Sequence, residues 1–200
     1  MTTTTRMGLL GASGAACLAA TIIAFHVLQP ELDPTRHYVS EYAYGTGGWI
    51  FTVGYVAAGV GAFLSAWAFA SAIAGWRAFA AAACLGLVGV GLVVTGVTRI
   101  DLAGANGTIV STASGQAHEL AGYIAILGLL PGSILAATAL GHSGDPAAAR
   151  WGWFLAAAAI IGFLAVMVAQ RLDAVGVGQR IFLAAALAWF AWVGVHTARA

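Results

Sequence analysis

The chain has 200 residues, of which 8% are charged and 61% are hydrophobic. Soluble domains carry about 25% charged residues, so the few ions here exclude a soluble fold of this length. The net charge of +1 argues against a nucleic-acid partner, and the absence of lysine excludes a retinal-type Schiff base. The composition therefore indicates an integral membrane protein.

Apolar stretches long enough to cross a membrane follow one another along the whole chain. A hydrocarbon core of about 30 Å needs roughly 20 apolar residues in a helix. Short polar segments separate six such stretches, at residues 7–28, 49–75, 78–98, 117–141, 151–169 and 179–198. They show none of the alternation typical of a membrane β-barrel. We predict an all-α fold with one domain over residues 1–200, a bundle of six transmembrane helices with one polar face.

An even number of spans places both termini on the same side of the membrane. That side holds the acid Asp145, whereas the opposite side holds Glu31, Asp33, Glu41, Asp101, Glu119 and Asp173. The eight arginines divide four against four, so the positive-inside rule gives no orientation. We expect a multi-pass protein of the cell membrane with cytoplasmic termini. In this orientation the longer, acid-containing loops are the ones translocated across the membrane.

Groups that can carry protons gather near the ends of three spans on the acidic side. Glu41 lies in a polar run before the second stretch, Asp101 follows the third, and His118 opens the fourth. A histidine near a helix start with a carboxylate in reach can serve as an acid, a base or a ligand. We predict that these three residues are catalytic and surround one cavity within roughly 10 Å, allowing for intervening water.

Other polar and aromatic residues on this side are predicted to bind substrate. They are Arg36, His37, Ser40, Tyr44, Trp49, Thr112, Glu119 and Arg180. The remaining histidines, His26, His142 and His196, are scattered over different depths, and we interpret them as structural. His37, Asp101 and His118 are able to supply three zinc ligands from one face, but no spacing demands a metal, so metal and cofactor stay open.

Several short motifs on the acidic side resemble those of one family. Residues 36–43 (RHYVSEYA), followed by Gly47-Gly48-Trp49, are similar to the first-loop signature of the domain-of-unknown-function 998 family. Further pieces match in order, namely Asp101, Thr112 with Gly115 and His118, and Gly178-Gln179-Arg180. The resemblance implies a prokaryotic integral membrane protein of about six helices. It implies no activity.

Two families of membrane enzymes share part of this residue set. Ser40, Asp101 and His118 are similar to part of the serine, aspartate and histidine set of intramembrane metal hydrolases such as alkaline ceramidases. The histidine pair spaced by four in their last helix is absent, because Trp192 stands four residues before His196. A carboxylic acid among aromatic residues would also suit an integral membrane terpene cyclase, although no motif supports that family.

Three functions are compatible with these residues, and the oligomeric state is open. The first is an enzyme acting on a lipid or isoprenoid, with Glu41 or Asp101 as acid/base and His118 as partner, since burial near lipid would raise a carboxyl pKa. The second is a transporter or binding protein for a small molecule or lipid, against which no internal repeat or interrupted helix pair is visible. The third is an accessory subunit of a membrane complex.

Overall fold

The computed structural model describes residues 1–104 and 108–199. Its helices are α1 (Thr3–Leu28), α2 (Trp49–Ala72), α3 (Trp76–Val97), α4 (Ala113–His142), α5 (Pro146–Arg171) and α6 (Val175–Arg199), and a short 3-10 helix, η1 (Val39–Tyr44), precedes α2. Within the described residues, six α-helices are long and apolar enough to cross a membrane. The predicted all-α, polytopic fold is confirmed.

Five of the six described α-helices begin earlier than the apolar stretches predicted, and polar side chains cap three of these, α1, α4 and α5. The Thr112 hydroxyl accepts a hydrogen bond from the Gly115 N–H, so α4 starts at residue 113 instead of 117. The Asp145 carboxylate accepts from the Ala148 N–H, so α5 starts at residue 146 instead of 151. Such caps satisfy amide groups that have no partner inside the helix.

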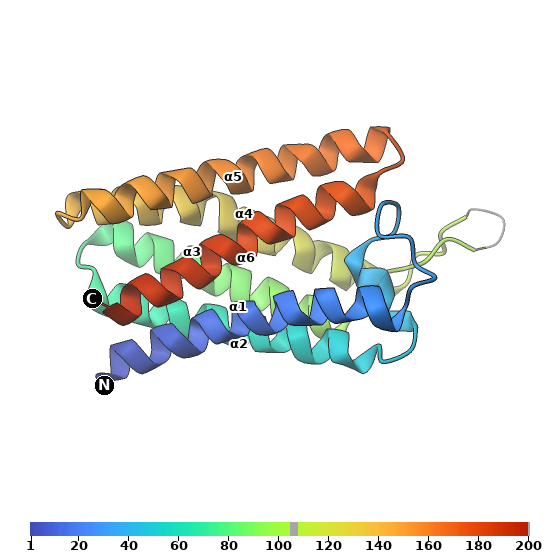
Figure 1. Cartoon of the computed structure of the whole chain (residues 1–200), viewed down its shortest axis with the longest axis horizontal. Coiled ribbons are helices and arrows are strands. Elements are labelled where there is room, and N and C mark those ends of the chain that lie inside the picture. The colour runs from blue at the N-terminus through green and yellow to red at the C-terminus, as the bar shows by residue number, and fades with distance from the viewer. Residues whose placement is uncertain (105–107, 200) are drawn as a thin grey trace.

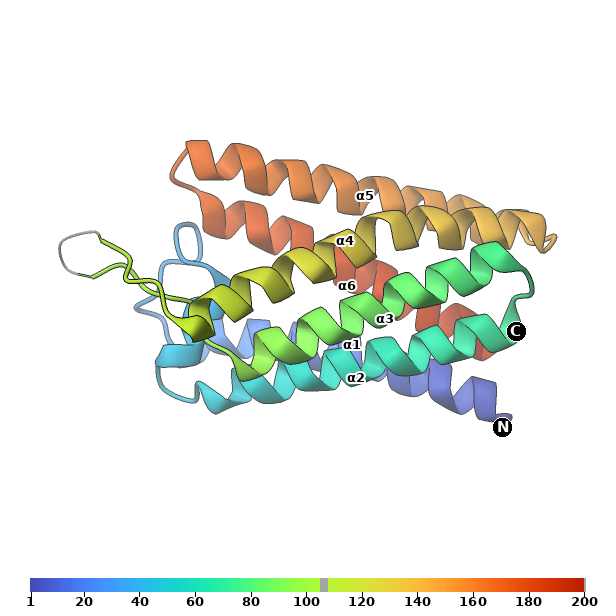
Figure 2. The ribbon, with the colours of Figure 1, turned by 180° about the vertical axis from the view of Figure 1, so that it is seen from behind.

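The helices form a closed ring around a shared core. Each helix packs against the next one in the chain, and α6 returns to contact α1 and also α2. The bundle is elongated, with both termini at one end and the connections α1–α2, α3–α4 and α5–α6 at the other (Figures 1 and 2). The buried core combines many alanines with a few large side chains, among them Phe25, Leu85, Leu140 and Trp189.

Glycines let α1 lie close to both of its neighbours in the ring. A Cβ added at Gly8 would come 2.5 Å from the carbonyl oxygen of Gly194 in α6. A Cβ added at Gly14 would come 2.6 Å from the carbonyl oxygen of Ala57 in α2. Small residues permit such close backbone approach in lipid, where packing rather than water drives helix association. The first helix therefore depends on glycine on two of its faces.

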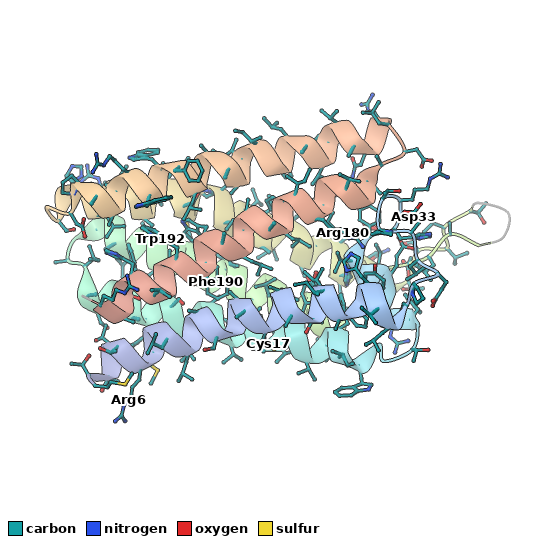
Figure 3. The ribbon with its side chains drawn as sticks, viewed as in Figure 1. Arg6, Cys17, Asp33, Arg180, Phe190 and Trp192 are labelled. Carbon is teal, nitrogen blue, oxygen red and sulfur yellow. The ribbon has the colours of Figure 1, made fainter. Side chains whose placement is uncertain are left out.

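We call the end of the bundle opposite to the termini the polar cap. It comprises residues 29–48, 98–104, 108–112 and 172–174 with the adjoining helix turns. Figure 3 shows Asp33 and Arg180 at this end and Arg6 at the other. Trp49 is strongly exposed on the cap side, and Trp76, Trp151 and Trp153 are exposed toward the other end, as expected for side chains at the two membrane interfaces. The predicted single polar face is confirmed.

Candidate functional site

Glu41 binds two groups of the loop that precedes η1. Its Oε1 accepts a hydrogen bond of 2.8 Å from the Tyr38 backbone N–H, which caps the short helix. Its Oε2 lies 2.8 Å from Nδ1 of His37. Both oxygens of the carboxylate are therefore engaged, and its orientation is fixed relative to the imidazole ring. We call His37 and Glu41 the dyad.

The contact with Glu41 determines the protonation pattern of His37. An ionised carboxylate only accepts hydrogen bonds, so Nδ1 of His37 carries the proton. In the neutral ring the second nitrogen, Nε2, then holds the basic lone pair. The His37 side chain is 39% exposed at the polar cap. A histidine oriented by a carboxylate in this way can take a proton from a hydroxyl group or a water molecule.

Arg180 attaches the loop of the dyad to the bundle. Its guanidinium donates to the His37 carbonyl at 2.9 Å, the Gly176 carbonyl at 3.0 Å and the Tyr42 hydroxyl at 3.0 Å. Its Nε donates to Nε2 of His26 at 3.1 Å. These bonds occupy most of the five N–H donors of a guanidinium. The structure thus directs Arg180, predicted to bind substrate, toward groups of the protein itself.

The first turns of α6 complete this attachment. The Gln179 side-chain oxygen accepts a hydrogen bond of 2.7 Å from the Val39 backbone N–H. Gly176 lies so close to the loop that an added Cβ would overlap the carbonyl oxygen of Pro34 and come 2.7 Å from that of His37. We call Gly176, Gln179 and Arg180 the loop-binding turn of α6. It holds the segment that carries the dyad.

Asp101 belongs to a second cluster, which closes the loop between α3 and α4. Its carboxylate accepts hydrogen bonds from the Thr112 hydroxyl at 2.6 Å and the Thr112 backbone N–H at 2.8 Å. These two bonds, from the side chain first and the backbone second, hold the pKa of Asp101 below its usual range. The shift is opposite to the raised pKa expected for a proton donor. Gly115 packs against this carboxylate, and a Cβ there would overlap it.

His118 is buried where α4 meets α3 and α2. Its Nδ1 lies 3.3 Å from the carbonyl oxygen of Thr98, which follows the last turn of α3. Its ring stacks on Phe51 of α2, with 6.4 Å between the ring centroids. A histidine that satisfies a carbonyl at a helix end and packs on an aromatic ring joins three helices.

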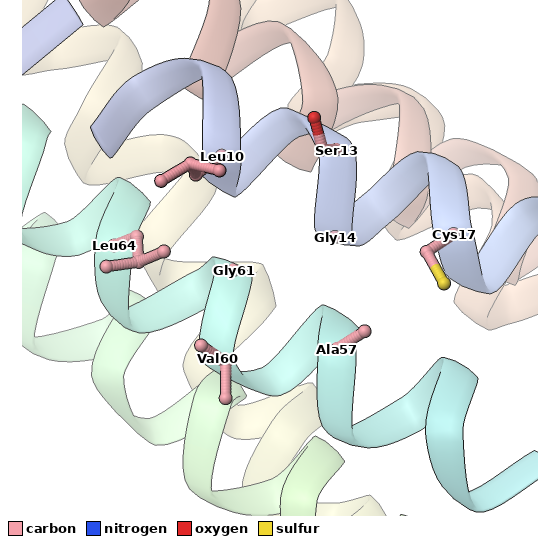
Figure 4. Close-up of a pocket in the computed structure, with 8 residues that line it drawn as sticks. All are labelled: Leu10, Ser13, Gly14, Cys17, Ala57, Val60, Gly61 and Leu64. Atoms are coloured by element: carbon pink, nitrogen blue, oxygen red, sulfur yellow. The ribbon is translucent and has the colours of Figure 1, made fainter. Parts of the chain in front are cut away.

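The three residues predicted to be catalytic therefore have different partners, and their common cavity stays a prediction. Two open grooves of about 390 and 370 Å³ lie elsewhere, the first beside Arg150 and Trp151 and the second between α1 and α2. The second is lined by Leu10, Ser13, Gly14, Cys17, Ala57, Val60, Gly61 and Leu64 (Figure 4). Across residues 1–104 and 108–199, no group of three or more His, Cys, Asp or Glu side chains is arranged to hold a metal ion.

Comparison with known proteins assigns the chain to a family without an established activity. The family model described as "Protein of unknown function (DUF998)" matches residues 12–196. The chain belongs to this family. No curated protein matches it, and no solved structure does. The resemblance inferred from the loop motifs is confirmed, and the DUF998 protein is a multi-pass membrane protein by the length and composition of its helices.

The remaining residues predicted to bind substrate are distributed over the cap of this DUF998 protein. Arg36 is exposed, and its Nη1 lies 3.6 Å from Oδ2 of Asp173. Ser40 is buried within η1, whereas Trp49 and Glu119 are exposed on α2 and α4. An ion pair as exposed as that of Arg36 contributes little to stability.

Tyr44 links the two clusters of the cap. Its hydroxyl donates to the Ile100 carbonyl, and the Arg99 guanidinium carbon lies 5.3 Å from the centroid of its ring. The end of η1 therefore contacts the α3–α4 loop that Asp101 and Thr112 close. The dyad and the Asp101 cluster are neighbours through this tyrosine.

Three residues of the DUF998 cap received no site role from the sequence. His26 contacts Arg180, and the buried Tyr42 accepts from the same guanidinium. Gln29, fully buried at the end of α1, donates to the Tyr42 carbonyl at 2.8 Å and the Thr46 carbonyl at 2.9 Å. In the sequence, Gln29 precedes Pro30 at the end of an apolar stretch, where a polar residue is expected in any case. No local pattern therefore indicates that Gln29 holds the loop.

Proposed function

We propose that this DUF998 protein is a membrane enzyme that transforms a lipid or isoprenoid by acid/base chemistry at the polar cap. The dyad is the proton-transfer pair. The observation that carries the proposal is the 2.8 Å contact between His37 Nδ1 and Glu41 Oε2, on a ring that stays partly exposed. Glu41 orients the ring through Nδ1, and Nε2 accepts the proton of an attacking hydroxyl or water.

The position of the dyad at the end of the bundle suits a substrate held in the membrane. A lipid keeps its head group at the level of the interfacial aromatic side chains, and Trp49, 71% exposed at the start of α2, indicates that level on the cap side. The tails would remain beside the apolar outer faces of the helices. The bond that reacts would then lie at the head group, within reach of the cap.

In this proposal, the other two residues predicted to be catalytic, Asp101 and His118, stabilise the scaffold. Asp101, whose pKa is lowered, is ionised at neutral pH and holds Thr112 instead of donating a proton. His118 binds the Thr98 carbonyl and packs on Phe51. His37 therefore replaces His118 as the histidine partner of Glu41.

In the proposed orientation, the protein lies in the cell membrane with its cap outside and its termini in the cytoplasm. The support is the larger number of acids and the greater length of the loops on the cap side. An impermeant thiol reagent applied to intact cells would label D33C and not R6C. The reverse labelling pattern would overturn the orientation and leave the chemistry untouched.

The experiment that tests the activity compares lipids in membranes containing the native protein, H37Q or E41Q. We expect the native protein to change the abundance of one lipid or isoprenoid class, measured by untargeted mass spectrometry. Because positioned acid/base catalysis contributes roughly 10²–10⁴-fold, both variants would lose that change.

The matched controls are H142Q and E31Q. His142 is an exposed histidine at the end of the bundle opposite to the cap, and Glu31 is an exposed acid of the cap outside the dyad. Both controls would behave as the native protein does. A native-like lipid profile in correctly inserted H37Q would exclude the dyad as the catalytic pair.

A further inference from the structure

His26 lies at the inner end of a hydrogen-bond chain that leads to the dyad. Its Nδ1 is 2.7 Å from the Ile22 carbonyl oxygen, one turn earlier in α1. Its Nε2 is 3.1 Å from Nε of Arg180 in α6. A carbonyl only accepts and a guanidinium only donates, so the two contacts permit one arrangement. His26 is neutral, with its proton on Nδ1 and a lone pair on Nε2.

Arg180 transmits this anchoring to the loop of the dyad. A guanidinium is planar and its N–H groups form a rigid fork, so fixing Nε also fixes the directions in which the other nitrogens donate. Those nitrogens bind the His37 carbonyl at 2.9 Å and the Tyr42 hydroxyl at 3.0 Å. Tyr42 is itself immobilised by stacking on Phe25 of α1, with ring centroids 5.0 Å apart. The backbone of His37 is thereby tied to both α1 and α6.

We propose that His26 is a positioning residue for the dyad, acting through Arg180. By accepting the Nε–H of Arg180, it keeps the His37 backbone where the ring meets Glu41. The effect of His26 on catalysis rests on the proposed function, whereas its effect on the position of His37 can be measured independently. A role in packing alone would be met equally by phenylalanine, which keeps an aromatic ring beside Tyr42 and loses both hydrogen bonds.

The first test is nitrogen NMR of the full-length protein labelled at histidine and held in lipid nanodiscs. In the native protein at neutral pH, we expect His26 to show a protonated Nδ1 and an unprotonated Nε2, and His37 to show one set of ring signals. An Nε2–H tautomer or an imidazolium at His26 would overturn the proposal. This measurement requires no variant, so it stands even if a substitution at residue 26 prevents folding.

The second test compares H26F with H26Q. H26F removes the acceptor for Arg180, so the single set of His37 ring signals should split or broaden. H26Q supplies an amide oxygen as acceptor and should restore the single set, which a bulk packing role would not predict. Unchanged His37 signals in H26F would overturn the positioning role, as would failure of H26Q to restore them.

The lipid assay separates this inference from the proposed function. A displacement of about 1 Å costs on the order of 100-fold in rate, so H26F should reduce turnover roughly 10- to 100-fold and H26Q should recover it. If the NMR shows the positioning and H37Q leaves every lipid unchanged, the function fails and the positioning stands. If H37Q abolishes turnover and H26F retains native turnover and spectra, the positioning fails and the function stands.

Discussion

The two loops of the polar cap use a carboxylate in different ways. In the α1–α2 loop, Glu41 faces an ionisable ring, that of His37, and the pair is partly exposed. In the α3–α4 loop, Asp101 faces the hydroxyl and amide of Thr112, which keep their protons at any physiological pH. The first arrangement can exchange a proton and the second can only hold a loop. The partner of an acid, more than its place on the polar side, distinguishes a chemical role from a structural one.

The largest expected effect comes from separating the first loop from the bundle. G176V adds atoms where the Pro34 and His37 carbonyls leave no room for a Cβ, so we expect a loss of about 1–3 kcal/mol in unfolding free energy. Turnover should fall with it, because the dyad loses its support. Unfolding in mixed detergent and the lipid assay measure the two effects.

The matched control for this change is G86A. Gly86 lies within α3, and a Cβ there meets no neighbouring atom within 4 Å. We expect its unfolding free energy to change by less than about 0.5 kcal/mol, as for other substitutions away from packed contacts. If G176V were as stable and active as G86A, the loop-binding turn of α6 would not support the dyad.

A pH change should separate the two loops without a large structural substitution. The folded pKa of Asp101 lies below its unfolded value, so its stabilisation is complete above about pH 4 and is lost as the pH falls through the folded pKa. The hydrogen-exchange protection factor of the Thr112 amide should therefore drop as the pH is lowered from neutral through the folded pKa of Asp101. In D101N, which keeps an acceptor oxygen but cannot ionise, this drop should disappear.

An internal reference for that experiment is the Val39 amide. It donates to the neutral side chain of Gln179, so no ionisable group accepts its hydrogen. A drop at Thr112 that persists in D101N would show that another group controls the α3–α4 loop. Equal drops at both amides would indicate general unfolding of the cap.

The smallest expected effect on turnover concerns His118 and sharpens the choice between the two histidines. H118F keeps a ring beside Phe51 and leaves the Thr98 carbonyl without its donor, so we expect a loss of about 1–2 kcal/mol in unfolding free energy. Turnover in the lipid assay should stay close to native. A folded H118F without activity would restore the site predicted from the sequence, with His118 as its histidine.

The spans and the polar end could be predicted because composition alone determines them. Runs of about 20 apolar residues leave a helix as the sole way to satisfy the backbone in lipid, and the placement of the acids follows from counting spans. Helix starts were placed too late at residues 117 and 151, since Thr112 and Asp145 extend α4 and α5 through polar caps. Hydropathy contains no information about such caps.

The candidate site was predicted in part. His37 and Glu41 stand four residues apart in one polar run, so their spacing is compatible with a local contact, although His37 was predicted to bind substrate. The contact of His26 with Arg180 joins residues separated by 154 positions, and nothing local in either helix indicates it. Asp101 and Thr112 belong to the matched motifs, but the two hydrogen bonds that Thr112 donates to Asp101 join residues 11 positions apart, and no local pattern indicates them.

The return of α6 to α1 has a consequence for biosynthesis. The segment that carries the dyad leaves the ribosome early, right after the first helix, yet it is held by the turn that begins the last one. Until that final span has been inserted, residues 34–44 have no Gln179 or Arg180 to bind. A nascent chain in the membrane therefore lacks these contacts, and the first loop gains its full set of partners only once the ring of helices has closed.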